Sequence, residues 1–359
     1  SCCSSNDIQP EQLHVAIIGS GSGAFASAIK AAEGGARVTI IEGADVIGGC
    51  CVNVGCVPSK ILIRAAQLAH QQRTNPFDGL ENIQPQLSRS LLAHQQNARV
   101  EELRDAKYQR ILESNPALSL LKGYARFKNQ NTLLVHKSDG SEEELVADRI
   151  LIATGSTPSI PPIKGLVDTP YWTSTEALFA EELPSSLVVI GSSVVALEIA
   201  QAYARLGSRV TILARHTLLY AEDPLLGEKL AECFEKEGIR VLNNTQASHV
   251  SYDSNGFSLE TNEGTLIAEK LLISTGRHAN TGKLGLETVG VETDKSGAIV
   301  VNSMMETSTA NIYAAGDCSN MPQFVYVAAA AGSRAGINMT GGNAPLDLST
   351  MPAVISPDP

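Results

Sequence analysis

Residues 15–24 read VAIIGSGSGA, and this stretch decides the fold. Four apolar residues suited to a buried strand lead directly into Gly19, Gly21 and Ala24, which fit the dinucleotide-binding pattern G-x-G-x-x-G/A. The first glycine allows a tight turn, the second lets a pyrophosphate approach the backbone, and the alanine keeps the following helix close to the strand. The stretch therefore predicts a strand, a glycine turn and a helix that bind a dinucleotide, against the alternative of an ordinary glycine turn.

The residues after this helix support the same interpretation. Residues 38–41, VTII, suit a second strand that ends at Glu42, 23 residues after Gly19. A carboxylate at this strand end suits hydrogen bonds to ribose hydroxyl groups, and the helix N-terminus offers N–H groups to phosphates. We expect a βαβ unit, which is the building block of doubly wound α/β folds.

A degraded copy of the pattern begins at Gly191, directly after a second apolar run, with Ser193 in place of the second glycine. Ala214 takes the position that the strand-end acid has in the first copy, and Arg215 and His216 follow it. A carboxylate there would repel a 2′-phosphate, whereas a guanidinium can bind it with two hydrogen bonds. We therefore predict an NADPH site in this copy. In the alternative interpretation, Arg215 is only a solvated charge at a strand end.

A cluster of cysteines lies in residues 48–60, which read GGCCVNVGCVPSK. On an ideal helix the offset from Cys51 to Cys56 corresponds to about 7.5 Å of rise, and a disulfide tolerates Cα separations only up to about 7 Å. If the two cysteines bond, the backbone between them is irregular, and Gly55 permits this. Zinc binding and buried structural thiols are the alternatives, but zinc usually needs two further ligands and no second pair stands nearby. The spacing favours a redox pair.

The composition argues against several classes of protein. A chain of 359 residues is long enough for more than one domain, and its 43% hydrophobic and 18% charged residues are ordinary for a globular protein. The net charge of −11 argues against nucleic acid as a partner. We find no apolar run long enough to span a membrane and no secretory signal. The seven cysteines cluster locally and do not spread as a disulfide scaffold would, which favours redox or metal chemistry in a reducing compartment, so we expect a cytoplasmic protein.

The cysteine stretch resembles the redox signature of the flavoprotein disulfide reductases, a family that includes glutathione reductase and dihydrolipoamide dehydrogenase. Four further segments agree with this resemblance, namely 19–24, 153–155, 275–277 and 314–317. It implies two Rossmann-like domains of the glutathione-reductase type, the second inserted in the first. The divisions it implies are a flexible tail at 1–12, an FAD-binding domain at 13–160 and 278–346, an NADPH-binding domain at 161–277, and the start of an interface domain at 347–359.

The resemblance also implies roles for individual residues. FAD would bind the first glycine turn and NADPH the second, with Asp317 hydrogen-bonded to the FAD ribitol. Cys56 would contact the flavin and Cys51 would exchange with substrate, while Lys60 would lie near the flavin and pair with Glu198. The further positions that the family's motifs place at a cofactor are Gly49, Thr154, Gly155, Gly276 and Val325.

Within the family, three segments resemble the mercuric reductases, namely 170–178, 191–198 and 322–332. This resemblance implies NADPH-dependent reduction of Hg(II) to Hg(0), with Cys51 and Cys56 as the thiols that bind the metal ion. Tyr108 would then be a tyrosine of the mercury site. The alternative for Tyr108 is an aromatic residue on a helix surface.

Two rival functions stay open at this point, namely reduction of a small organic disulfide of the glutathione or lipoamide type, and an FAD-binding fragment without turnover. The family forms homodimers through its C-terminal interface domain, and the sequence ends where that domain should begin, so we expect a monomer. Cys50 replaces the threonine usual before the first redox cysteine, and this third thiol either scrambles the disulfide or offers a further metal ligand. We interpret Cys2-Cys3 as an incidental pair rather than a metal carrier.

Overall fold

The computed structural model describes residues 12–357. The expected flexible tail, apart from its last residue, and the Cys2-Cys3 pair lie outside the described residues. Within them the chain forms two compact units. The first unit contains residues 12–49, 105–156 and 278–350, and the second contains residues 50–104, 157–277 and 351–357.

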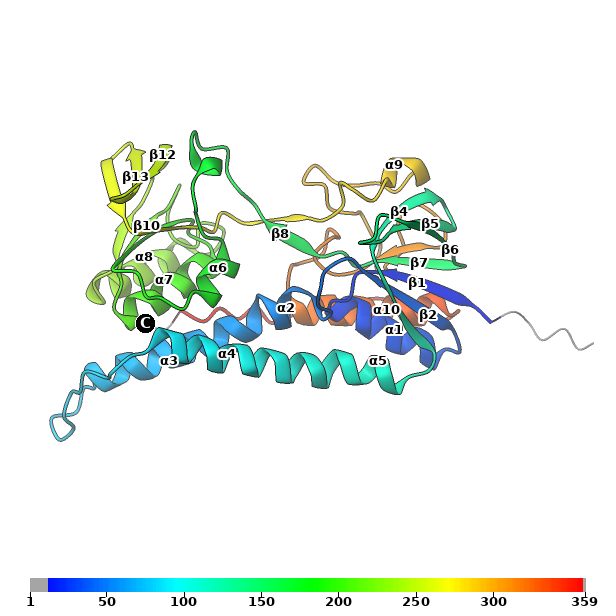
Figure 1. The fold of residues 1–359 in the computed structure, drawn as a ribbon, viewed down its shortest axis with the longest axis horizontal. Coiled ribbons are helices and arrows are strands. Elements are labelled where there is room, and N and C mark those ends of the chain that lie inside the picture. Colours follow the sequence, from blue (N-terminus) through cyan, green and yellow to red (C-terminus); the bar gives the residue numbers. More distant parts are fainter. Residues whose placement is uncertain (1–11, 358–359) are drawn as a thin grey trace, which may run out of the picture. The chain divides into compact units, whose positions relative to one another are not determined.

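The first unit is built on a five-stranded parallel sheet with the strand order β17-β7-β1-β2-β3. Its central strand is buried along its whole length, as expected for a parallel strand covered on both faces. Helices α1 (Ser22–Glu33) and α10 (Val325–Met339) lie side by side along the sheet (Figure 1). The strands of the sheet are β1 (His14–Ile18), β2 (Arg37–Glu42), β3 (Leu118–Lys122), β7 (Arg149–Ile152) and β17 (Ile312–Ala314).

The second unit repeats this plan with a four-stranded parallel sheet, order β11-β10-β9-β15. Its strands are β9 (Ser186–Ile190), β10 (Arg209–Leu213), β11 (Arg240–Leu242) and β15 (Lys270–Ile273). Its helices α6, α7 and α8 are Ser174–Phe179, Val194–Leu206 and Pro224–Lys236. The predicted α/β class, with two βαβ units of one architecture, is confirmed.

Each unit also carries a small antiparallel sheet of three strands. In the first unit these are β4 (Tyr124–Asn129), β5 (Thr132–His136) and β6 (Glu142–Val146), and in the second β12 (Ala247–Asp253), β13 (Gly256–Thr261) and β14 (Gly264–Ala268). The remaining short elements are β8 (Ser156–Pro158), a 3-10 turn (Leu166–Asp168), β16 (Arg277–Ala279) and α9 (Leu286–Val289).

A run of helices follows the first βαβ unit, namely α2 (Gly49–Asn53), α3 (Cys56–Arg73), α4 (Arg89–Arg104), a π-helix (Asp105–Gln109) and α5 (Arg110–Ser114). The helices predicted at about 56–71 and 87–112 are both present, the second with a π-helical turn inside it. Residues 50–104 group with the second unit, although we expected them in the domain at 13–160. The assignment of FAD and NADPH to the two units stays a prediction. None of the helices in residues 12–357 is both long enough and apolar enough to span a membrane.

Candidate functional site

The first glycine turn depends on close contact between backbones. Gly19 has a φ of +108°, and a Cβ at this position would lie 2.2 Å from the carbonyl oxygen of Ala153. A Cβ on Gly49, whose φ is +69°, would lie 2.6 Å from the Cα of Gly21. Glycine is therefore required at both places. Gly21, which has no side chain, is the N-cap of α1, and a glycine at this position lets a pyrophosphate approach the backbone closely.

The carboxylate at the end of β2 is held in place next to this turn. Ser20 Oγ donates a hydrogen bond of 2.5 Å to Glu42 Oε2, and the backbone N–H of Ala44 donates one of 2.7 Å to Oε1. Ser20 Oγ also accepts a bond of 3.2 Å from the N–H of Gly48. Sequence reasoning missed Ser20, and its only signal is a hydroxyl residue between the first two glycines of the pattern.

The carboxyl ends of β7 and β17 bring further predicted residues to the same edge of the first sheet. Thr154 Oγ1 donates a hydrogen bond of 2.8 Å to the carbonyl oxygen of Asn280, and Gly155 has a φ of +68°. Asp317 Oδ2 accepts a bond of 2.8 Å from Ser156 Oγ. Ligands of open parallel sheets bind at the carboxyl ends of the strands. Two other predicted positions are the buried Ala24 in α1 and Val325, the first residue of α10.

Tyr108 lies inside the first unit and not on a helix surface. Its side chain is 7% exposed, its hydroxyl oxygen is 3.1 Å from Ser22 Oγ, and its ring meets Phe25 edge-on at 5.0 Å. The surface-aromatic alternative is therefore wrong. Tyr108 sits on the π-helix, a conformation that is often found at functional sites. Its proposed contact with mercury stays a prediction.

The second glycine turn repeats the steric requirement of the first. Gly191 has a φ of +136°, and a Cβ there would lie 2.1 Å from the carbonyl oxygen of Ser274. Ser193 is the N-cap of α7 and makes no side-chain capping hydrogen bond. Gly276, which follows β15, has a φ of +105° with open space where a Cβ would lie. The predicted glycine positions thus gather at the carboxyl end of the second sheet.

The loop after β10 carries Arg215 and His216 to this second turn. The N–H of Leu219 donates a hydrogen bond of 3.0 Å to the carbonyl oxygen of Ser192, which ties the loop to the turn. Arg215 and His216 are exposed on this loop, and His216 stacks on the exposed Tyr220 with ring centroids 4.3 Å apart. The loop offers positive charge and an aromatic face to an anion bound at the turn.

The backbone between the two redox cysteines is broken, as the spacing predicts. Helix α2 ends at Asn53 and α3 begins at Cys56, so Cys51 and Cys56 belong to different helices. A Cβ on Gly55 would lie 3.0 Å from the carbonyl oxygen of Cys50 and 3.3 Å from the Cα of Cys51. Glycine at this position lets the start of α3 approach α2 closely.

The pKa values of the two thiols are shifted in opposite directions. A hydrogen bond from the Cys51 thiol to Cys56, aided by the positive charge of Lys60, lowers the pKa of Cys56 to about 7 against the opposing effect of burial. The same hydrogen bond and burial raise the pKa of Cys51 far above its usual range. Cys56 is therefore the thiol that ionises first, which agrees with its expected role as the thiolate of the pair.

Lys60 and Glu198 form an ion pair within the second unit. The distance from Lys60 Nζ to Glu198 Oε2 is 2.6 Å, and α3 packs along α7, which carries Glu198. The carboxylate is only 6% exposed, and its other oxygen, Oε1, accepts a hydrogen bond of 3.0 Å from the N–H of Ser356. Both oxygens of the buried carboxylate thus have donors. Nothing in the sequence marks Ser356 as the second donor.

The Cys50 thiol contacts an arginine, whereas the thiols of Cys51 and Cys56 are hydrogen-bonded to each other. Arg277 Nη2 donates a hydrogen bond of 3.5 Å to Cys50 Sγ. Within residues 12–357 no three His, Cys, Asp or Glu side chains are grouped closely enough to hold one metal ion. The expected role of Cys50 as a further metal ligand stays a prediction, and in this structure its thiol accepts a hydrogen bond from Arg277.

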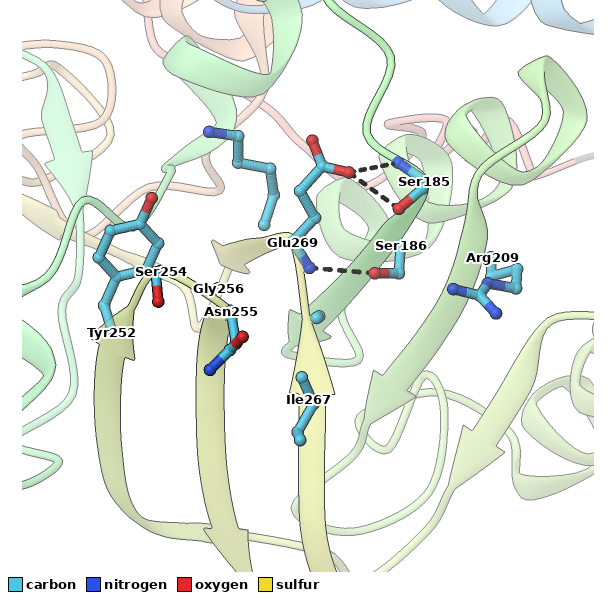
Figure 2. Close-up of a pocket in the computed structure, with 11 residues that line it drawn as sticks. Ser185, Ser186, Arg209, Tyr252, Ser254, Asn255, Gly256, Ile267 and Glu269 are labelled. Atoms are coloured by element: carbon cyan, nitrogen blue, oxygen red, sulfur yellow. Dashed lines mark hydrogen bonds between the residues drawn. The ribbon is translucent and has the colours of Figure 1, made fainter.

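A polar surface pocket of about 610 Å³ lies at the opposite end of the second sheet (Figure 2). It is lined by residues at the amino ends of the strands, such as Ser186 and Arg209, and by Glu269, which accepts hydrogen bonds from Ser185. None of the predicted site residues lines this pocket. The glycine turn at Gly191 follows the carboxyl end of β9, so the two sites are distinct.

Comparisons with known proteins agree with this geometry. A mercuric reductase from Shewanella putrefaciens is 75% identical over 362 residues and aligns with 100% of this chain. One from Shigella flexneri is 59% identical over 353 residues and aligns with 97% of it. The chain spans 65% and 62% of the lengths of these two relatives, which is less than two thirds.

The solved structures and the family model extend the likeness to the fold. The HOCl-induced flavoprotein disulfide reductase RclA from Escherichia coli superposes with a TM-score of 0.81 at 29% identity, over 92% of this chain and 72% of that one. The model of a family described as pyridine nucleotide-disulphide oxidoreductase matches residues 13–332. The predicted fold of the flavoprotein disulfide reductases is thus confirmed, and the chain belongs to the pyridine nucleotide-disulphide oxidoreductase family.

Proposed function

We propose that this chain carries the electron-transfer part of a mercuric reductase, in which NADPH and Hg(II) give NADP⁺, H⁺ and Hg(0). The observation that carries the proposal is the thiol pair, in which a hydrogen bond from Cys51 and the charge of Lys60 lower the pKa of Cys56 to about 7. Thiolates are the preferred ligands of soft metal ions. A pair that is partly ionised at neutral pH suits both metal binding and redox exchange.

We propose that the first unit binds FAD at the turn of Gly19 and Gly21. The lack of side chains at Gly19 and Gly21 supports this, because it lets a pyrophosphate approach the backbone closely. Glu42, held by Ser20, is oriented to accept hydrogen bonds from a ribose. Bound FAD supplies two-electron transfer between a nicotinamide and the thiol pair. The chain's own contribution is to hold that group in one orientation.

We propose that the second unit binds NADPH at the turn of Gly191. The loop that is tied to this turn presents Arg215 and His216 to solvent, and the strand end itself carries the buried, uncharged Ala214. A 2′-phosphate therefore meets a guanidinium and no carboxylate at this position. This charge pattern favours NADPH over NADH.

The remaining assignments follow the same proposal. Lys60 and Glu198 are proposed to tune the charge next to Cys56, and Tyr108 is proposed to contact the metal ion. Chemistry that uses NADPH and reduced thiols suits the cytoplasm. The resemblance implies a homodimer for the family, and light scattering measures the oligomeric state of this chain.

The test is NADPH oxidation by the FAD-reconstituted chain with Hg(II) and an excess of monothiol. We expect turnover that depends on Hg(II), its loss in Cys51→Ser and Cys56→Ser, and little change in the control Cys233→Ser, which alters a half-buried cysteine of α8. Faster turnover with a small organic disulfide than with Hg(II) would assign the chain to the other branch of the family. Flavin reduction without turnover on either substrate would contradict the proposal for this chain.

A further inference from the structure

Tyr108 makes two contacts with helix α1, both within the first unit. Its ring meets Phe25 edge-on with the ring centroids 5.0 Å apart, and its hydroxyl oxygen is 3.1 Å from the Oγ of Ser22. Ser22 and Phe25 are three positions apart in α1, so they share one face of the helix. The hydroxyl of Tyr108 therefore lies at the first residue of α1, directly after the glycine turn.

The contact with Ser22 depends on the hydroxyl group of Tyr108 and not on its ring. Phenylalanine would fill the same space against Phe25, whereas tyrosine also brings a hydroxyl group to Ser22. Tyr108 is buried, and a buried hydroxyl costs free energy unless it is hydrogen-bonded, so the bond to Ser22 offsets that cost. Ser22 itself is only half-buried, so its hydroxyl stays accessible to a ligand at the start of α1.

We propose that Tyr108 is a positioning residue for FAD, which acts on the pyrophosphate through the hydroxyl group of Ser22. The inference rests on the proposed function in one respect, because it takes FAD as the ligand of the first glycine turn. A serine hydroxyl has one hydrogen to donate and can accept a hydrogen bond at the same time. When Tyr108 donates its hydrogen to Ser22 Oγ, the hydrogen of Ser22 is available to a phosphate oxygen.

A bound anion selects the direction of this hydroxyl pair. Without an anion either hydroxyl group can donate to the other. A phosphate oxygen only accepts, so it orients the Ser22 hydrogen toward itself, and Ser22 Oγ then accepts from Tyr108. Hydrogen bonds in such a chain polarise and strengthen one another. The N–H groups and the dipole at the start of α1 favour the same anion, so Tyr108 adds to an existing preference.

The test measures FAD binding and not turnover. FAD is titrated into the FAD-free full chain, and flavin fluorescence gives the affinity for the parent, Tyr108→Phe, Ser22→Ala and the double variant. Phosphorus NMR of the bound FAD reports the surroundings of the pyrophosphate directly. Tyr313→Phe is the matched control, because Tyr313 is a similarly buried tyrosine of the same unit, in β17. Circular dichroism checks that each variant is folded.

We expect Tyr108→Phe and Ser22→Ala each to weaken FAD binding roughly 2- to 10-fold, the usual effect of one lost neutral hydrogen bond. Both should also move the phosphorus resonances of the bound FAD, which a loss of ring packing alone would not do. Because Tyr108 acts through Ser22, the double variant should bind FAD no more weakly than Ser22→Ala does. Tyr313→Phe should bind FAD as the parent chain does.

Unchanged FAD affinity and unchanged phosphorus resonances in Tyr108→Phe would overturn the inference. An equal loss of affinity from Tyr108→Phe with and without the Ser22 hydroxyl would also overturn it, because the tyrosine would then act by another route. A failure of the proposed function is distinguishable from both results. It would appear as absent Hg(II)-dependent turnover in a parent chain that binds FAD, whatever the affinities of the variants.

Discussion

The two glycine turns of the molecule are alike in backbone and opposite in charge. A Cβ at Gly19 would lie 2.2 Å from a carbonyl oxygen at the end of a neighbouring strand, and a Cβ at Gly191 would lie 2.1 Å from the corresponding oxygen. The strand after the first turn ends in the fixed carboxylate of Glu42, whereas the strand after the second ends in Ala214 and the exposed Arg215. The shared sterics suit a dinucleotide at each turn, and we propose that the residue at the strand end selects which one.

The comparison extends to the rest of each unit. In the first unit the polar residues at the sheet edge are tied to one another, as Glu42 is to Ser20 and Asp317 to Ser156. In the second, Arg215 is exposed, and Cys56 is an exposed thiol whose pKa is lowered to about 7, mainly by a hydrogen bond from Cys51. A cofactor that stays bound suits the first arrangement, and one that exchanges suits the second.

The largest expected effect comes from adding a side chain at Gly19 in the first glycine turn. Gly19→Ala adds a clash to a backbone conformation that costs an L-residue about 1–3 kcal/mol, so we expect FAD affinity to fall at least about tenfold. The FAD content of the purified chain measures this. In the control Gly35→Ala, the φ of +88° is also unfavourable but nothing lies within 4 Å of the added Cβ. We expect Gly35→Ala to lose some stability but to keep its full FAD content. Equal loss of FAD in Gly19→Ala and Gly35→Ala would contradict the comparison.

Removing the charge at the second strand end tests selectivity. Arg215→Ala deletes charge-assisted hydrogen bonds of about 1.5–3 kcal/mol, so the KM for NADPH should rise roughly 10- to 100-fold while that for NADH stays nearly constant. Steady-state kinetics with both nucleotides measure the ratio. Arg209→Ala, at the other end of the same strand, is the matched control and should change neither KM. An unchanged preference in Arg215→Ala would make this residue a solvated charge only.

A smaller effect is expected at the thiol pair. The positive charge of Lys60 lowers the pKa of Cys56, so Lys60→Met should raise that pKa above about 7. The rate of Cys56 alkylation would then reach half its maximum at a higher pH, and the rate at pH 7 would fall. Iodoacetamide kinetics across pH measure this shift. Lys229→Met, which removes an exposed lysine of α8, should leave the profile in place; an identical shift in both variants would exclude a specific role for Lys60.

The smallest effect concerns stability. Burial lowers the pKa of His14, which is the first residue of β1, and its ring nitrogens contact Val146 O at 2.8 Å and Thr39 Oγ1 at 2.9 Å. Since the folded-state pKa lies below the unfolded value of 6.5, the stabilisation is complete above that value and is lost as pH falls. Ser186 begins β9 in the second unit and does not titrate in this range.

Thermal melts between pH 7 and pH 5 check this contrast. The loss of stability on acidification should be smaller in His14→Gln than in the parent chain. A loss of the same size in both would assign the acid sensitivity to other groups.

Much of the fold follows from local sequence. The runs before Gly19 and Gly191 are apolar on both faces of a strand, and the structure has them as β1 and β9 within one residue of the expected ends. The break between Cys51 and Cys56 was also predictable, because a helix holds the two sulfurs apart and a glycine stands between them.

Other features depend on contacts between distant residues. The π-helix contains Tyr108, whose side chain packs against Phe25 and contacts Ser22. No local sequence pattern marks this helix. Ser356 reaches Glu198 across 158 positions, and Arg277 reaches Cys50 across 227. The grouping of residues 50–104 with the second unit arises in the same way, since α3 packs on α7. Sequence periodicity carries no information about such partners.

The central claim is that electrons from NADPH reach Hg(II) through this chain, and an anaerobic titration of the FAD-reconstituted protein tests it most directly. NADPH is added until the flavin absorbance is lost, and Hg(II) is then added with excess monothiol. The account predicts that the oxidised flavin spectrum returns with one NADPH oxidised per Hg(II), and that it does not return in Cys51→Ser. A chain that retains no FAD, or a reduced flavin that Hg(II) leaves unchanged, would contradict the account.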